Sequence, residues 1–189
     1  MAIKQLRSIY QVKVSLKGAK PPIWRRLLVP SNLTLGQFHM VLQISMGWTD
    51  SHLHQFISDG VYYGMSDEEL DSWMEIENEN KFKLSQLLTK EKDSLVYEYD
   101  FGDGWEHKVT LEKILPYDNK TELPKCIKGK LACPPEDCGG IWGYYGLLEI
   151  INDPENPEHE EMLEWLGGDF DPEALDLEEI NALLAKYCR

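Results

Sequence analysis

Alternation of polar and apolar residues near the N-terminus predicts an antiparallel sheet. Between positions 8 and 18 every second residue is apolar, which is the period of a half-buried strand: Tyr10, Val12, Val14 and Leu16. Pro21 and Pro22 end this run, and residues 23–29 form a second extended segment. Consecutive segments of this kind usually pair, so we expect the two strands to be antiparallel neighbours.

A helix is predicted after these strands, from Thr34 to Gly47. Thr34 and Gln37 have the spacing of a capping box, and Gly47 supplies the left-handed residue that commonly ends a helix. A new segment with strand period follows. Its residues His52 and His54 are two positions apart, so we expect both imidazoles on the same face of a strand.

The most distinctive stretch is the hairpin centred on residues 99–107. A two-residue loop would set its aromatic residues against charges, whereas a three-residue loop over 102–104 keeps the apolar residues together. The second register pairs Phe101 with Trp105 and Tyr99 with His107. It places His107 on the aromatic face, and it sets Asp100 opposite Glu106 on the other face.

The rest of the chain is predicted to be mainly loop and helix. Residues 66–80 are acidic and weakly periodic, which favours a loop with a short turn capped by Ser66. A Pro- and Gly-rich irregular stretch covers 125–140, and three helical segments follow it: 144–151, 158–166 and 177–187. The fold class is therefore α+β, with an antiparallel sheet of about five to six strands, one early helix and a C-terminal cluster of helices.

Nothing in the sequence divides the 189 residues, which predicts a single domain over residues 1–189. No linker-like tract or internal repeat is present. The first residues lack the apolar core of an export signal, and no run of about 18 apolar residues occurs. The sequence therefore predicts a cytoplasmic protein without membrane contact.

Charge is distributed unevenly along this acidic chain, whose formal net charge is -14. Residues 1–48 contain seven Lys or Arg and no Asp or Glu, whereas residues 132–189 contain fifteen acids and two bases. Acidic helix faces exposed to solvent explain the second half. The alternative is that the basic end contacts a polyanion.

Five segments resemble one known family over nearly the whole chain. These are residues 20–26, 46–54, 97–107, 132–140 and 170–173, which read KPPIWRR, MGWTDSHLH, YEYDFGDGWEH, ACPPEDCGG and FDPE. The chain resembles the plasmid ORF-3-like family, named after the third open reading frame of a root-inducing plasmid. The resemblance implies an α+β domain found on plasmids and mobile elements. It implies no reaction, cofactor or catalytic residue.

A ligand-binding pocket is predicted where the segment of His52 and His54 meets the hairpin. Its expected lining is His52, His54, Tyr99, Asp100, Asp103, Trp105 and His107. Two imidazoles on one strand face can chelate a transition metal if a third ligand approaches, and His107 or one of the aspartates could supply it. The commoner alternative is that these histidines are satisfied polar groups among aromatics.

Two other sets of residues suggest chemistry. Cys126, Cys133 and Cys138 could bind zinc or another divalent metal if they converge, but no CxxC pair occurs, so small buried thiols in a Pro- and Gly-rich loop are the favoured explanation. Trp24, Arg25 and Arg26 combine an aromatic with two cations, as nucleic-acid contacts do. The low pI of about 4.7 argues against a nucleic-acid partner.

The features together favour a binding or interaction module, in a plasmid or mobile-element context, over an enzyme. The partner of such a module would be a protein or a nucleic acid. A metal-dependent hydrolase that uses the His/Asp pocket is one alternative. An accessory nucleic-acid-binding protein is the other.

Overall fold

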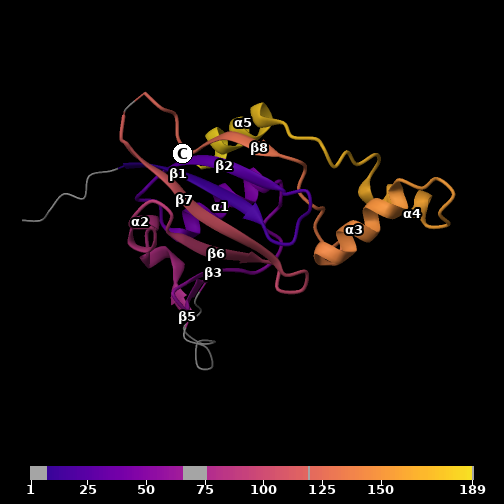
Figure 1. The fold of residues 1–189 in the computed structure, drawn as a ribbon, viewed down its shortest axis with the longest axis horizontal. Helices are drawn as coiled ribbons and strands as arrows, with labels where there is room; N and C mark the ends of the chain where they lie inside the picture. Colours follow the sequence, from indigo (N-terminus) through magenta and orange to yellow (C-terminus); the bar gives the residue numbers. More distant parts are fainter. Residues whose placement is uncertain (1–7, 66–75, 119, 189) are drawn as a thin grey trace, which may run out of the picture.

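The computed structural model describes residues 8–65, 76–118 and 120–188, and its centre is a single sheet of eight strands. The strand order across the sheet is β5-β4-β3-β6-β7-β1-β2-β8 (Figure 1). Every neighbouring pair is antiparallel except β4 and β5, which are parallel. The strands are β1 (Ser8–Leu16), β2 (Trp24–Pro30), β3 (His54–Ser58), β4 (Val61–Gly64), β5 (Ile76–Asn78), β6 (Ser94–Tyr99), β7 (Trp105–Pro116) and β8 (Lys125–Lys130).

The α+β class and the mainly antiparallel sheet are confirmed, but the sheet has more strands than the predicted five to six. Two of the additional strands are its edges: β5 lies in the predicted acidic loop, and β8 lies in the predicted irregular stretch. Both are short and carry few apolar residues, so their strand conformation depends on pairing with the neighbouring strand and not on an alternating apolar pattern of their own. The turn predicted at Ser66 falls outside the described residues.

The predicted capping of the first helix, α1 (Leu35–Met46), is confirmed. Thr34 and Gln37 exchange both hydrogen bonds of the capping box, and Gly47 ends the helix with φ 94°. Helices also occur between the strands, so they are not only early and C-terminal as predicted. The others are the 3-10 turn η1 (Glu79–Lys81), α2 (Leu84–Leu87), α3 (Gly140–Ile151), α4 (His159–Leu166) and α5 (Leu177–Tyr187). No helix in the described part of the chain is long and apolar enough to cross a membrane.

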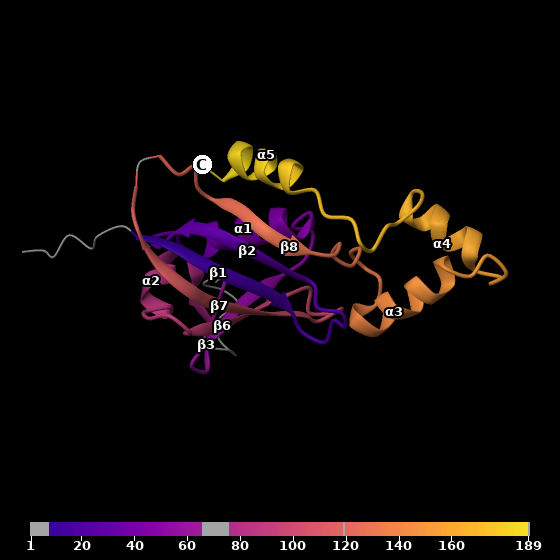
Figure 2. The ribbon, with the colours of Figure 1, turned by 45° about the horizontal axis from the view of Figure 1, so that its top comes forward.

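The helices cover only one face of the sheet. Helix α1 packs on the inner face, where apolar residues of β1, β2, β6 and β7 form the core, and α5 lies beside it near β8 (Figure 2). Helices α3 and α4 project from one end of the sheet (Figure 1). The outer face, made of the alternate residues of the same strands, has no helical layer among the described residues.

The central hairpin has the predicted faces and a different register. Tyr97 pairs with His107, and Tyr99 pairs with Trp105, so the loop has five residues instead of three. The predicted register was therefore wrong by two residues, a shift that keeps the strand side chains on their predicted faces. Phe101 lies in the loop with half of its surface exposed instead of opposite Trp105, and Glu106 faces Glu98 instead of Asp100. The physical reason is Asp100, whose carboxylate accepts from the backbone N–H groups of Gly102 and Asp103 and closes the turn early.

Candidate functional site

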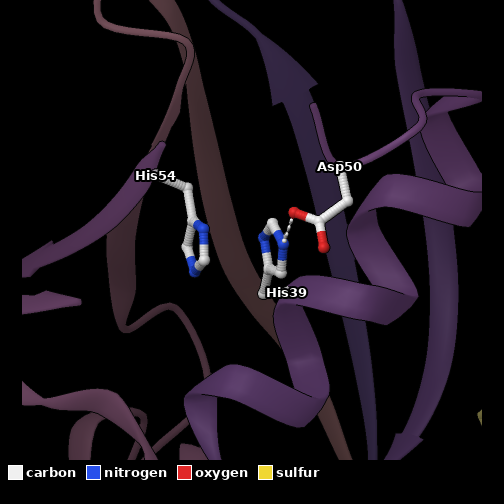
Figure 3. A group of neighbouring side chains, drawn as sticks. All are labelled: His39, Asp50 and His54. Carbon is white, nitrogen blue, oxygen red and sulfur yellow. Dashed lines mark hydrogen bonds and ion pairs between the residues drawn. The ribbon is translucent and has the colours of Figure 1, made fainter. Parts of the chain in front are cut away.

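Two stacked histidines form the centre of the site (Figure 3). His39 comes from α1 and His54 from the first residue of β3, and their ring centroids lie 3.4 Å apart with an interplanar angle of 6°. Both side chains are buried at the boundary between the helix and the sheet. Two imidazolium cations stacked at this distance would repel each other strongly, so at least one of the two rings is favoured in its neutral form.

Each histidine has a carboxylate partner of its own. Asp50 Oδ1 lies 2.8 Å from His39 Nε2, and Glu79 Oε2 lies 2.8 Å from His54 Nε2. Glu79 is buried, with 3% of its surface exposed, whereas the Asp50 side chain is 45% exposed. The Asp50 backbone N–H donates to the Gln43 side chain, which holds the turn after α1 in place.

A hydrogen-bond chain fixes the protonation of His39. Gln43 Nε2 donates to the Tyr97 hydroxyl over 2.9 Å, and this hydroxyl lies 2.9 Å from His39 Nδ1. The Tyr97 proton is therefore free to point at Nδ1, which leaves Nε2–H to donate to Asp50. Burial and the neighbouring His54 lower the pKa of His39, and Asp50 only partly opposes them. Both observations favour a neutral His39.

The cluster opens onto a pocket of about 440 Å³. The pocket wall includes apolar groups such as Met40 and Leu53 beside the polar cluster. Its ionisable lining residues are His39, Asp50, His52, His54 and Glu79. A ligand in this pocket would therefore meet both stacked histidines and their carboxylate partners.

Two groups of side chains in the described residues have ligand atoms close enough to share one metal ion. In the first, atoms of His39, Asp50 and His54 lie within 4.8 Å of one another, and the second consists of His52, Asp100 and Asp137. His52 Nε2 is 3.1 Å from Asp137 Oδ1 and 3.7 Å from Asp100 Oδ2. The second group is the more open to solvent, because Asp137 is 67% exposed.

The predicted pairing of His52 with His54 changes in the structure. Both residues line the pocket, but they belong to different ligand groups. The reason is that β3 begins at His54, so the strand alternation that would align the two imidazoles does not include His52.

His107 lies in the core and is not among the residues that line the pocket. Its ring is 5.5 Å from that of Tyr97, and Tyr97 is in turn 6.1 Å from His54. Nδ1 lies 3.3 Å from the Tyr97 carbonyl oxygen, whereas buried Nε2 has no hydrogen-bond partner among the described residues. His107 is therefore separated from the histidine pair by an aromatic ring.

The other hairpin residues in the predicted lining hold the structure together. Tyr99 donates its hydroxyl to Glu136 and Trp105 is buried in the core. The Asp100 carboxylate closes the hairpin loop, and the Asp103 carboxylate accepts from the backbone N–H of Gly139. Tyr99 and Asp103 therefore anchor the loop before α3, and none of these four side chains is among the residues that line the pocket.

The three cysteines do not form a ligand group. No set of three ligand atoms within 4.8 Å includes a thiol in the part of the chain that the structure describes. Cys126 is buried in β8, and Cys133 Sγ lies 3.6 Å from the sulfur of Met46. Burial raises the pKa of both Cys133 and Cys138 to about 12, which disfavours the thiolate that zinc requires.

Arg25 is not available to nucleic acid, which corrects the prediction for this residue. Its side chain points into the core, is 2% exposed, and donates to the carbonyl oxygens of Ser45, Trp24 and Lys130. Arg26 points to the outer face and forms a two-pronged salt bridge with Glu112. Trp24 shares this outer face with Arg26.

Four residues of the cluster were not predicted from the sequence: His39, Gln43, Glu79 and Tyr97. One signal was present: His39 and Gln43 are polar residues four positions apart in a mainly apolar helix, and this spacing puts them on one face. Glu79 carried no such signal, because its segment was predicted to be a loop.

Acid is expected to destabilise the fold through His107. Burial lowers the pKa of His107 from 6.5 to about 4, so below pH 6.5 the unfolded chain binds a proton that the folded protein excludes. The free energy of unfolding should therefore fall by about 3 kcal/mol as the pH drops from 6.5 to about 4. Urea denaturation across this range should show a shallower pH dependence for His107→Gln. Identical slopes for both proteins would contradict this assignment.

Comparison with known proteins identifies the family of this chain. The family model described as plasmid pRiA4b ORF-3-like protein matches residues 8–179. Uncharacterized protein y4hQ of Sinorhizobium fredii (strain NBRC 101917 / NGR234) is 39% identical over 189 residues, which cover 96% of this chain and 95% of the relative. The crystal structure of a protein of unknown function, MM3350 from Methanosarcina mazei Go1, superposes with a TM-score of 0.82 at 41% identity, covering 93% of this chain and 98% of that one. The resemblance seen in the sequence is thus confirmed, and the chain belongs to the plasmid pRiA4b ORF-3-like family.

Proposed function

We propose that the protein is a binding module for a divalent transition metal, with His39, Asp50 and His54 as ligands. The observation that carries the proposal is that two imidazoles and a carboxylate lie within 4.8 Å of one another at a pocket of about 440 Å³. Nitrogen and oxygen ligands in this combination suit zinc and similar ions. The proposal keeps His54 from the sequence-based metal site and replaces His52 and His107 with His39 and Asp50.

The partners of His54 support this assignment. A histidine that binds metal usually gives the N–H of its other ring nitrogen to a carboxylate, which fixes the tautomer. Glu79 is placed for this role, because its carboxylate lies 2.8 Å from His54 Nε2. Nδ1 of His54 then carries the lone pair, and no described residue bonds to it.

His39 can also bind the metal ion, provided that its ring proton moves from one ring nitrogen to the other. Binding through Nε2 requires the ring proton to move to Nδ1, and the Tyr97 hydroxyl oxygen, 2.9 Å away, can accept a hydrogen bond from the resulting Nδ1–H. The low pKa of His39 helps, because a neutral imidazole does not have to lose a proton to solvent before it binds. Since lone pairs lie in the ring plane, a shared ion would draw the two rings out of their parallel stack.

A metal-dependent hydrolase is the second candidate, and the open pocket favours it. Three protein ligands and one open position are typical of catalytic zinc sites, where the ion lowers the pKa of a bound water. The pocket leaves space for such a water and for a small substrate. A binding module and a hydrolase would use the same ligands and differ in whether that water reacts.

Zinc titration of the chelator-treated full chain tests the proposal. We expect one zinc ion per chain by calorimetry, with affinity that decreases on acidification because protons compete for the imidazoles. The zinc-loaded protein is then offered a p-nitrophenyl phosphodiester, and release of p-nitrophenolate that depends on His54 identifies the hydrolase. Absence of zinc uptake by the folded protein contradicts both functions.

A further inference from the structure

The outer face of the sheet carries a concentrated positive charge on an otherwise acidic protein. Residues that pair across neighbouring strands lie on the same face of the sheet. The register of β7, β1, β2 and β8 therefore shows which residues form the outer face, in three rows that each cross these four strands. We call this set the basic face. Its members are Trp24 and the cations Lys13, Arg26, Lys108, Lys113, Lys125, Lys128 and Lys130.

The cations recur in each row. In the first row Lys108 and Lys130 flank Ser15 and Trp24. In the second, Lys13, Arg26 and Lys128 are adjacent on three strands. In the third, Lys113 and Lys125 lie at the two ends of the row that passes through Gln11 and Leu28. Adjacent strands lie roughly 4.8 Å apart, so seven cations fall within an area about 15 Å across.

Little of this charge is neutralised within the chain. Glu112 is the carboxylate in these rows, and it pairs with Arg26. Lys108, Lys113, Lys125, Lys128 and Lys130 are exposed, and none of them forms an ion pair with a described residue. No helix covers the face in the described part of the chain (Figure 2). Such a patch attracts a polyanion.

We propose that the basic face binds single-stranded nucleic acid through its phosphates, with Trp24 as an aromatic contact for a base. Trp24 lies in the first row of the face, next to the second-row cations, with Lys13 Nζ and the Arg26 guanidinium each 5.1 Å from its ring. A stacking aromatic surrounded by cations is the arrangement that sequence-tolerant single-strand binding requires. The major groove of a duplex admits a helix or a two-stranded ribbon, and this four-stranded face is too broad for it.

The net charge of -14 does not prevent this contact. At about 0.1 M salt, charges are screened over roughly 10 Å, so a bound phosphate senses the nearest cations most strongly. The acidic helix α4 projects from the end of the sheet (Figure 1). This proposal is independent of the metal site, because His39, Asp50 and His54 lie on the helix-covered side of the sheet.

The test is fluorescence anisotropy with a labelled oligothymidylate of about 16 nucleotides, measured over a series of salt concentrations. Replacing Lys13, Lys128 and Lys130 with Gln removes three phosphate contacts. Each contact contributes about -0.7 to the slope of log affinity against log salt, so the slope should become shallower by about 2 and affinity near 0.1 M salt should fall about a hundredfold. Lys81→Gln/Lys83→Gln/Lys186→Gln is the matched control, since these exposed lysines lie outside the basic face, and its affinity should equal that of the original protein.

A second variant separates stacking from charge. Trp24→Leu should weaken binding at least fivefold and leave the salt slope unchanged, because it removes a stacking surface and no cation. Three results would overturn the proposal: no binding at low salt, equal loss in the control triple variant, or equally tight binding of poly-glutamate. The last result would identify an acidic protein segment as the partner of the basic face.

Discussion

Replacing His54 with alanine is expected to weaken zinc binding by about 100- to 1,000-fold. This range corresponds to the share of one ligand when the roughly 10–16 kcal/mol of binding free energy at a structural zinc site with four protein ligands is divided equally. Glu79→Gln should weaken binding less, by about 10- to 100-fold, because Glu79 orients His54 without touching the ion in the proposed site. Competition with a zinc-selective dye measures both values.

Two control variants make the His54 result specific. His52→Ala removes an imidazole that lines the same pocket but belongs to the other ligand group. Cys133→Ser removes one of the three cysteines that the sequence suggested as metal ligands. Both should retain the original zinc affinity. If His52→Ala causes the larger loss, the ion belongs to the group of His52, Asp100 and Asp137. If Cys133→Ser causes it, the cysteines hold the metal.

Replacing Arg25 with methionine is expected to lower the free energy of unfolding by about 2–4 kcal/mol, because buried carbonyl oxygens lose their donor. Arg25 Nε lies 2.8 Å from the Ser45 oxygen, and Nη1 lies 3.0 Å from that of Trp24 and 3.2 Å from that of Lys130. The guanidinium therefore ties α1, β2 and β8 together. Methionine retains much of the packing and supplies no donor.

The adjacent residue is a matched control for this prediction. Arg26→Met removes the same charge from a partly exposed position on the opposite face, where the salt bridge with Glu112 contributes about 0–1 kcal/mol. Urea denaturation of the two variants should therefore give clearly different midpoints. Equal midpoints would show that the carbonyl contacts of Arg25 do not stabilise the fold.

The alternation of apolar and polar residues predicted which side chains of the hairpin share a face, but it did not predict the length of the loop. Side chains alternate between the two faces of a strand, so any register shift by an even number of residues keeps the same aromatic set on one face. That set is Tyr97, Tyr99, Trp105 and His107. The length of the loop depends on the hydrogen bonds of one side chain, Asp100, with the backbone of the turn. Such a bond is a property of the folded turn, and alternation along the strands does not encode it.

The proposed site was predicted only in part, because its residues come from separate elements. His54 was identified from its spacing, whereas His39 is on α1, Asp50 is in the following turn and Glu79 is in η1. Their proximity depends on the packing of α1 against β3 and on the short edge strand β5. Arg25 shows the same limitation, since two of its acceptors are distant in sequence, at Ser45 and Lys130.

The most direct test of the proposed metal site is an anomalous difference map from crystals of the zinc-loaded protein, recorded at the zinc absorption edge. We expect one strong peak bonded to His39, Asp50 and His54, with His54 Nε2 still next to the Glu79 carboxylate. A map without density at this position, or with zinc bound only by His52, Asp100 and Asp137 or by the cysteines, would contradict it.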